Sequence, residues 1–364
     1  MKKSLIARFH GPNQPFEIYE QPIVAPNANS VLVQISLATI CGSDLHTVLG
    51  RRSAPTPCVL GHEIVGVVAA PTHIRDAYGT PLREGDRITW SMVASCGECQ
   101  YCCDPRNLPQ KCEQLFKYGH GPSEGDYALS GGFAEYIYLR PGTAIYPVPD
   151  SMSDAEAVPL NCAFGTVLNG LEVIGGARQE GPQSVVIQGA GMLGIYAACY
   201  LRESGCEIVA VVDCLPERLQ IAKRFGATHT FNLSKLGAEQ IGEALRALTH
   251  GQGVDLAVEV SGVVEAFTNS INWLGIGGRC VTLGFVYPNA NVTMDTHQVV
   301  TKCLTIRGNH NYHPAALGRA IQFVEEKRAQ YPFAELIGAT YPLNEINAAF
   351  DQAIQGNYIR IAIG

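Results

Sequence analysis

The first 150 residues contain short apolar runs, rich in β-branched and aromatic side chains, that are separated by Gly and Pro. Such runs indicate β-strands, because branched and ring side chains pack well on a half-buried sheet. The pattern predicts a β-rich domain with long loops. The clearest runs are SVLVQISLATI at 30–40, IVGVVAA at 64–70 and FAEYIYL at 133–139.

From about residue 161, apolar strands alternate with segments of helical period. SVVIQ at 184–188 leads into a Gly-rich turn, IYAACYLRESG at 195–205 indicates a helix closed by Gly205, and EIVAVVD at 207–213 is the next strand. This alternation predicts an α/β fold with a doubly wound parallel sheet and right-handed crossovers. The chain ends in the β-like YIRIAIG at 358–364, which we expect to return to the first domain.

The composition and charge indicate which classes of binding partner the protein can have. Hydrophobic residues make up 46% of the chain, enough for large buried cores, and the formal charge of −7 argues against nucleic-acid or anionic-membrane binding. The longest apolar runs are interrupted by Gly or charge, and no N-terminal segment has the order of a signal peptide. We therefore expect a cytoplasmic protein without a membrane span, whose 13 cysteines are reduced and whose partner is a small molecule.

The Gly-rich turn has the G-x-G-x-x-G spacing, follows an apolar strand and opens a helix. Asp213 comes 19 residues after its last glycine, where it can accept hydrogen bonds from a ribose and repel a 2′-phosphate. This context predicts a site for NAD rather than NADP, the alternative being a tight turn without a ligand. The predicted coenzyme-binding turn comprises Gly189, Gly191, Met192, Leu193 and Gly194.

Five cysteines crowd into residues 95–112. Cys96, Cys99, Cys102 and Cys112 are spaced as C-x2-C-x2-C-x9-C, and four thiolates with no open position are typical of a structural zinc site. Cys103 is the spare thiol, and it can replace Cys102 if the loop winds differently. Unliganded thiols and a redox pair are the alternatives, but the cluster lies outside the strand–helix pattern of redox motifs.

A second group of candidate ligands is scattered along the chain, and each member alone also fits an ordinary role. Cys41 and Cys162 lie in apolar settings where cysteine is commonly a core residue. His62 fits a buried, hydrogen-bonded imidazole equally well, and Glu63 fits a solvated carboxylate. The residues by themselves leave this choice open.

Taken together, four motifs resemble the zinc-containing medium-chain alcohol dehydrogenases over essentially the whole chain. The motifs are CGSDLH at 41–46, GHEIVG at 61–66, CGECQYC at 96–102 and GAGMLG at 189–194. The resemblance implies a β-rich GroES-like catalytic domain and a Rossmann coenzyme domain. The expected bounds are 1–160 for the first, 161–310 for the second, and 311–364 for a return to the first.

The resemblance also implies roles at the second group of residues. Cys41, His62 and Cys162 match the catalytic zinc ligands, and Glu63 matches the neighbouring carboxylate that can join them. Ser43 matches the hydroxyl that takes the alcohol proton, and His46 the outer end of the proton relay. We expect Asp44 to orient a zinc-bound imidazole, its alternative being a surface or capping residue.

For the coenzyme, the resemblance implies that Arg218 lies near the adenosine ribose and that Arg360 reaches the pyrophosphate. Both fit ordinary solvated arginines as well. The chain departs from the family in the structural-zinc lobe, where the segment between the third and fourth cysteines is two residues longer than usual. That departure leaves the choice between Cys102 and Cys103 open.

Three further stretches resemble a narrower branch, the phosphonate-catabolism-associated alcohol dehydrogenases. They are CGSDLHTVLGRR, LPQKCEQLFKYGH and LSGGFAEYIYLRPGTAIYPVPD. The branch implies an alcohol that bears a phosphonate. Arginine forks match phosphonate oxygens, so we hypothesise that Arg51 or Arg52 contacts the substrate. Further basic residues expected near the cleft are Lys117, His120, His310 and His313. For each of them the alternative is a solvated loop charge.

The sequence thus favours an NAD- and zinc-dependent dehydrogenase of a small alcohol or polyol, with one catalytic and one structural zinc per chain. A zinc-free quinone or enoyl reductase is the enzymatic alternative, and it would lack the catalytic ligands. A non-catalytic coenzyme-binding protein is the other alternative, and it would not need Ser43 and His46. The family resemblance implies a homodimer or homotetramer.

Overall fold

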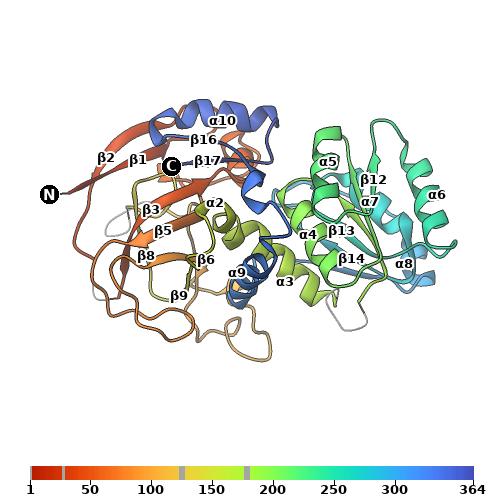
Figure 1. The fold of residues 1–364 in the computed structure, drawn as a ribbon, viewed down its shortest axis with the longest axis horizontal. Helices are drawn as coiled ribbons and strands as arrows, with labels where there is room; N and C mark the ends of the chain where they lie inside the picture. Colours follow the sequence, from red (N-terminus) through yellow and green to blue (C-terminus); the bar gives the residue numbers. More distant parts are fainter. Residues whose placement is uncertain (1, 27–28, 123–127, 176–180) are drawn as a thin grey trace. The chain divides into compact units, whose positions relative to one another are not determined.

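The computed structural model describes residues 2–26, 29–122, 128–175 and 181–364. The chain divides into two compact units (Figure 1). Unit 1 comprises the residues up to Gly165 together with His313–Gly364, and unit 2 comprises Thr166–Tyr312.

Unit 1 contains two β-sheets whose strands are β1 (Lys3–Phe9), β2 (Glu17–Pro22), β3 (Val31–Thr39), β4 (Cys58–Val59), β5 (Glu63–Val68), β6 (Arg87–Ala94), β7 (Phe116–Lys117), β8 (Tyr136–Leu139), β9 (Thr143–Pro147), β16 (Ile337–Tyr341) and β17 (Arg360–Ile363). The larger sheet has the order β16-β17-β3-β5-β6-β7, with β8 paired to β3 and β9 to β6. The smaller sheet has the order β2-β1-β4. The expected β-rich character of this part of the chain is therefore confirmed.

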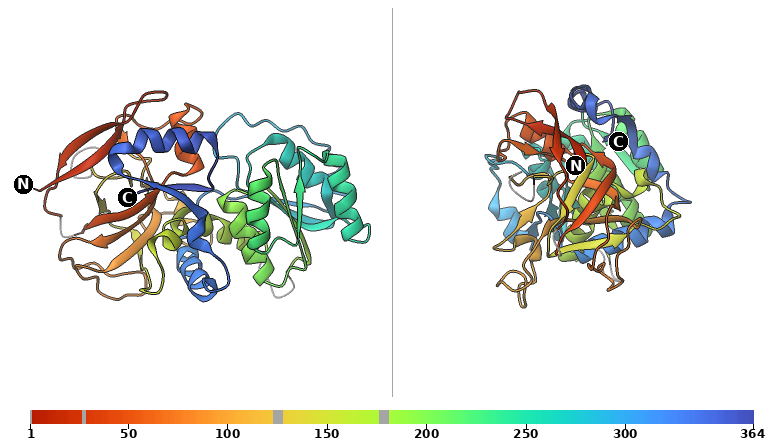
Figure 2. Two further views of the ribbon diagram at one scale, coloured as in Figure 1. Left: turned by 45° about the horizontal axis from the view of Figure 1, so that its top comes forward. Right: turned by 90° about the vertical axis from the view of Figure 1, so that its left-hand side faces the viewer.

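The C-terminal segment completes the larger sheet of unit 1 (Figure 2). Strand β17 pairs antiparallel with β3, so that Ala362 lies opposite Thr39 and Ile363 opposite Ala38. The helical segments of unit 1 are α1 (Gly42–Val48), η1 (Pro109–Lys111), α2 (Asp154–Ala157), the π-helical turn η3 (Leu160–Phe164), α9 (Ala315–Lys327), η4 (Phe333–Leu336), η5 (Leu343–Glu345) and α10 (Ile346–Gln355).

Aromatic packing holds the C-terminal segment to the N-terminal strands. The ring of Phe350 in α10 lies 4.7 Å from that of Phe16 and 5.6 Å from that of Phe133, centroid to centroid. All three rings are buried in one apolar cluster. Burial of such rings stabilises the unit by roughly 1.5–3 kcal/mol per side chain, and it fixes the position of β17.

Unit 2 contains one parallel sheet in the order β12-β11-β10-β13-β14-β15. The strands are β10 (Ser184–Gln188), β11 (Ile208–Asp213), β12 (His229–Asn232), β13 (Val254–Glu259), β14 (Leu274–Thr282) and β15 (Thr305–Gly308). The strand order reverses between β10 and β13, as in doubly wound dinucleotide-binding sheets, which confirms the predicted fold class. Because crossovers are right-handed, the helices of the two halves cover opposite faces.

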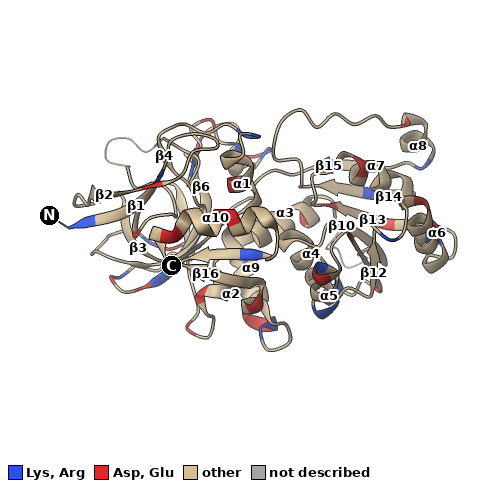
Figure 3. Cartoon of the chain, turned by 90° about the horizontal axis from the view of Figure 1, so that it is seen from above, with Lys and Arg blue, Asp and Glu red and all other residues tan. Residues whose placement is uncertain are grey.

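The helices of unit 2 are α4 (Met192–Glu203), α5 (Pro216–Arg224), α6 (Ala238–Leu248), α7 (Val264–Trp273) and α8 (Thr296–Thr301), and α3 (Gly165–Val173) leads into the unit. Within the described ranges, no helix has both the length and the apolar character that crossing a bilayer requires. Lys and Arg are interspersed with Asp and Glu in both units (Figure 3).

Candidate active site and metal centres

Three metal-binding side chains meet in unit 1. Cys41, His62 and Cys162 are all buried, and one donor atom of each lies within 4.8 Å of the donor atoms of the other two. Both cysteines are free thiols. Two thiols and an imidazole are a donor set typical of catalytic zinc, which uses three protein ligands.

Strand pairing explains why residues so far apart in sequence converge. Strands β3 and β5 are antiparallel, with Thr39 opposite Glu63. Cys41 follows the end of β3, and His62 immediately precedes β5, so both lie at the same end of this strand pair. Cys162 comes from η3, a turn that contacts β5 and β6.

Asp44 holds both N-terminal ligands in place from within α1. Its Oδ2 accepts a 2.9 Å hydrogen bond from the backbone N–H of Cys41, and its Oδ1 lies 3.4 Å from Nδ1 of His62. The carboxylate is fully buried, so it is not a surface residue, but its bond to the N–H of Cys41 also caps the start of α1. A carboxylate on Nδ1 leaves Nε2 of the imidazole as the atom that can bind a metal.

The two predicted relay residues lie on the same helix. Ser43 is half-buried, and its hydroxyl lies 3.3 Å from Nε2 of His62, the ring atom that faces the metal cluster. His46 is half-buried three residues further along α1. Burial, together with the positive charge of Arg51, lowers the pKa of His46 below its ordinary value. A neutral His46 can accept a proton near neutral pH.

Glu63 and Arg360 form a buried ion pair at the cluster. Arg360 donates from Nε to Glu63 at 2.9 Å and from Nη2 at 2.7 Å, and Nη2 also lies 3.5 Å from Sγ of Cys41. Thr39 donates its hydroxyl to the same carboxylate. The sequence predicts that Arg360 reaches the coenzyme pyrophosphate and gives no sign of its ion pair with Glu63. The pyrophosphate contact stays a prediction.

The cluster is electrostatically coupled. The hydrogen bond with Cys162 lowers the pKa of Cys41 well below its ordinary value, whereas the same partnership raises the pKa of Cys162. Burial opposes the charged form of His62, but Asp44 and Cys41 together outweigh it and raise the pKa of His62 to about 9. Burial raises the pKa of Glu63 to about 7 against the opposing charge of Arg360.

These shifts bear on whether zinc fits the site. Two buried thiols cannot both ionise beside each other without a cation, because the second negative charge would be uncompensated. A divalent ion provides that compensation and lets both act as thiolate ligands. The donors present therefore fit zinc.

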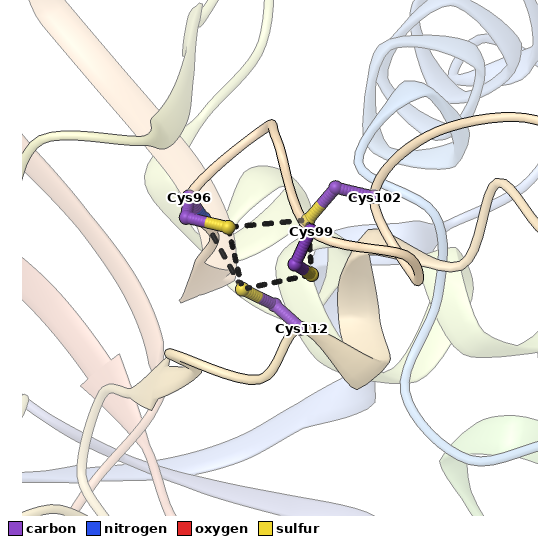
Figure 4. Close-up of side chains that lie close together, drawn as sticks. All are labelled: Cys96, Cys99, Cys102 and Cys112. Atoms are coloured by element: carbon purple, nitrogen blue, oxygen red, sulfur yellow. Dashed lines mark hydrogen bonds between the residues drawn. The ribbon is translucent and has the colours of Figure 1, made fainter.

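The four predicted structural-zinc cysteines converge in a second cluster in unit 1 (Figure 4). Their sulfur atoms are separated by 3.4 Å for Cys96–Cys112, 3.5 Å for Cys99–Cys102, and 3.9 Å for Cys96–Cys102 and Cys99–Cys112. Tetrahedral zinc with bonds of about 2.3 Å requires sulfur separations of roughly 3.8 Å. The cluster therefore has the size of a zinc cage.

The structure also separates Cys102 from Cys103. Cys103 is exposed, and its sulfur lies 3.5 Å from the carbonyl oxygen of Gly97, outside the four-sulfur cluster. The longer segment to the fourth cysteine is taken up by a turn in which Leu108 N–H bonds the carbonyl of Tyr101. The following η1 brings Cys112 back to the cluster. The geometry thus favours Cys102 as the ligand.

In unit 2, the Gly-rich turn joins β10 to α4 as the sequence predicts. Gly189 has φ of +108°, which favours glycine, and a Cβ on Gly194 would lie 1.9 Å from the carbonyl oxygen of Gly189. Gly191 is the N-cap of α4, which begins at Met192, and Leu193 is half-buried in the first turn of α4. This is the close strand–helix contact that leaves backbone N–H groups facing a pyrophosphate.

Asp213 ends β11 beside that turn. Its Oδ2 accepts a 2.7 Å hydrogen bond from the N–H of Ala190, and its Oδ1 accepts one of 2.9 Å from Leu215. The carboxylate is thereby fixed next to the glycines. Arg218 is half-buried in the first turns of α5, five residues further along.

Comparisons with known proteins agree with this geometry. Two family models match, "Alcohol dehydrogenase GroES-like domain" over residues 27–150 and "Zinc-binding dehydrogenase" over residues 193–326. The 5-exo-hydroxycamphor dehydrogenase of Pseudomonas putida is 30% identical over 350 residues, which cover 95% of each chain. The chain belongs to the zinc-dependent medium-chain alcohol dehydrogenases.

Other relatives of this chain carry different activities in their names. An L-threonine 3-dehydrogenase of Edwardsiella ictaluri is 31% identical over 295 residues, 79% of this chain and 78% of its own. An alcohol dehydrogenase of Thermotoga maritima superposes with a TM-score of 0.93 at 28% identity, covering 100% of this chain and 99% of that one. Unit 1 is accordingly the GroES-like domain and unit 2 the Rossmann domain of the family. These relatives lend the phosphonate branch no support, so it stays a prediction.

The predicted substrate arginines of this dehydrogenase differ in environment. Arg51 is exposed, whereas Arg52 is half-buried, and its Nη1 lies 2.8 Å from Nε2 of His120. The ring of His120 in turn lies 4.6 Å from that of His62, centroid to centroid. The sequence predicts His120 only as one of the basic residues near an anionic substrate, because nothing in its spacing from Cys41 or His62 links it to the metal ligands.

Proposed function

We propose that the chain transfers a hydride between a small alcohol or polyol and NAD, using one catalytic and one structural zinc per chain. The observation that carries the proposal is the buried convergence of Cys41, His62 and Cys162 with Ser43 beside the imidazole. A zinc-free reductase would not need this donor set, and a non-catalytic binder would not need the hydroxyl.

Zinc held by Cys41, His62 and Cys162 would supply Lewis-acid polarisation of the substrate oxygen. Side chains of the protein are then proposed to transfer the proton of the alcohol. Ser43 Oγ is the proposed acceptor of the alcohol proton, and His46 the proposed group that passes it to solvent, since its lowered pKa keeps the imidazole neutral. Asp44 fixes the ring of His62 throughout.

Glu63 is the proposed mobile member of the site. Burial raises its pKa to about 7, and Arg360 and Thr39 hold its oxygens away from solvent. Released from Arg360, this carboxylate could join Cys41, His62 and Cys162 as a ligand for zinc. Arg360 would then set how readily Glu63 moves.

The choice of NAD over NADP rests on Asp213. Its carboxylate is fixed by the N–H of Ala190 in the Gly-rich turn and by the N–H of Leu215 after β11, where it can accept hydrogen bonds from ribose hydroxyls. The same charge would repel a 2′-phosphate. Arg218 is proposed to flank the adenosine ribose.

A phosphonate-bearing alcohol is the finer candidate substrate, supported by arginines that follow the relay helix. A reducing compartment such as the cytoplasm would suit a protein with thiols as metal ligands. A homodimer or homotetramer is the proposed assembly, in keeping with the symmetric oligomers that soluble enzymes commonly form.

The test is NADH formation by the purified, zinc-loaded protein offered two matched sets of alcohols. One set carries a phosphonate or phosphate, such as 2-hydroxyethylphosphonate, and the other consists of neutral diols and primary alcohols. NADP is run in parallel. Turnover with NAD that is lost in the Cys162→Ala variant supports the proposal, and no turnover of any alcohol in either direction contradicts it.

A further inference from the structure

A basic cluster of Arg52, Lys117 and His120 lies in unit 1 beside the metal ligands. Nδ1 of His120 lies 3.1 Å from the carbonyl oxygen of Tyr118, which can only accept, so Nδ1 carries the proton. Nε2 of a neutral His120 is then the acceptor for Nη1 of Arg52. His120 thus holds the guanidinium while remaining uncharged.

Lys117 adds a second cation to this cluster. Burial and then the charge of Arg52 lower the pKa of Lys117 to about 8, and the groups that act to raise it are Cys162, Cys41 and Asp44. The N–H of His120 bonds the carbonyl oxygen of Lys117 at 3.2 Å, so these two residues share one tight turn. Arg52 contacts that turn through its hydrogen bond to His120.

Two backbone contacts hold this basic cluster in place. The N–H groups of Arg51 and Arg52 both bond the carbonyl of His46, which turns the chain back at the end of α1. A Cβ on Gly119 would lie 2.2 Å from the carbonyl oxygen of Gly61, so the two backbones touch. Since His62 follows Gly61 and His120 follows Gly119, this contact keeps the cluster against the metal ligand.

We propose that Arg52, Lys117 and His120 form a subsite that binds the anionic group of the alcohol substrate, a carboxylate or a phosphonate or phosphate. An anion bound between these side chains would gain charge-assisted hydrogen bonds from both Arg52 and Lys117. Arg52 provides a planar fork and Lys117 a point charge. The inference rests on the proposed function, because it assigns the substrate class of the same site, and it excludes the exposed Arg51.

Calorimetric titration of the zinc-loaded protein with methylphosphonate and with acetate tests the subsite without turnover. We expect binding that Arg52→Gln and Lys117→Met each weaken about 10- to 100-fold, and that Arg52→Lys weakens less. Arg51→Gln is the matched control, expected to change affinity by less than about twofold. Circular dichroism verifies that each variant is folded, and the preferred anion separates a phosphonate or phosphate from a carboxylate source.

Turnover supplies the second measurement. For Arg52→Gln, the ratio of kcat/KM for an anionic over a neutral alcohol should fall about 10- to 100-fold. If neither anion binds the unaltered protein, or if Arg52→Gln and Lys117→Met bind as it does, the subsite is overturned. Turnover of neutral alcohols without anion binding would overturn the subsite alone. Arg52-dependent binding without any turnover would overturn the proposed function alone.

Discussion

The buried ion pair of Arg360 and Glu63 shows how a single residue links the C-terminal strand to the metal cluster. The guanidinium makes two hydrogen bonds to the carboxylate and one contact to Cys41. Breaking a buried pair is expensive, because the remaining charge loses its partner in a place without water. The pair therefore matters for folding as well as for chemistry.

We predict that Arg360→Met lowers the free energy of unfolding of unit 1 by about 3–5 kcal/mol. Adding Glu63→Gln should recover a large part of the loss, because no charge is then left unpaired. Urea unfolding measures both, followed by the fluorescence of the buried Trp90 in a Trp273→Phe background, so that only unit 1 reports. A double variant no more stable than Arg360→Met would contradict the pairing argument.

A pH profile tests His46. In the proposed relay the neutral form of His46 accepts the proton, so activity should fall as the pH drops through the pKa of His46. The lowered pKa places this acid limb below about pH 6.5. Arg51→Gln removes one of the charges that lower the pKa, so the limb should move to higher pH. Arg75→Gln, an exposed arginine elsewhere in unit 1, is the control and should leave the limb in place.

At the residue scale, the sequence indicated which side chains carry chemistry where the family motifs included them. It could not place Arg360 on Glu63, because that contact depends on β17 returning to β3 across the whole chain. It also grouped His120 with the basic residues that favour an anionic substrate but could not place it beside His62, because that contact depends on the close approach of Gly61 and Gly119.

At the scale of elements, the structural-zinc lobe is a loop organised by its four cysteines. Its winding decides which of two adjacent thiols faces the others, and spacing alone could not settle this. The structure turns Cys102 inward and leaves Cys103 at the surface.

We predict that Cys102→Ser removes one equivalent of zinc per chain, whereas Cys103→Ser retains the full content. Zinc content by atomic emission after gel filtration measures the difference. Because four thiolates hold a structural zinc together, losing one should also lower the thermal midpoint of unfolding. The reverse pattern would assign the site to Cys103.

The proposed preference for NAD depends on Asp213 at the end of β11. Asp213→Ser should lower kcat/KM for NAD about 10- to 100-fold and raise the NADP-to-NAD preference, because the fixed carboxylate is lost. Glu217→Gln, an exposed carboxylate nearby in α5, controls for a change in net charge. An unchanged coenzyme preference in Asp213→Ser would remove the basis for choosing NAD.

The strand–helix alternation of unit 2 was predictable because each element carries its own apolar period and the turn glycines mark the boundaries. The π-helical turn that presents Cys162 was not, since no local signal distinguishes it from an ordinary helix start. Such turns depend on tertiary packing more than on local preference.

On the scale of the whole molecule, the family could be predicted from the sequence because its motifs are spread over both units. The substrate was not, since it depends on how side chains from separate loops pack together. The relatives include a hydroxycamphor and a threonine dehydrogenase, which shows that one scaffold serves unlike alcohols.

The central claim is that hydride passes from an alcohol carbon to NAD only with the Cys41–His62–Cys162 metal site intact. The direct measurement is mass spectrometry of the NADH formed from an alcohol deuterated at its carbinol carbon, by the unaltered protein and by Cys162→Ala. We expect one deuterium per NADH from the unaltered protein and no NADH above background from Cys162→Ala. Deuterated NADH from Cys162→Ala at an undiminished rate would contradict this claim.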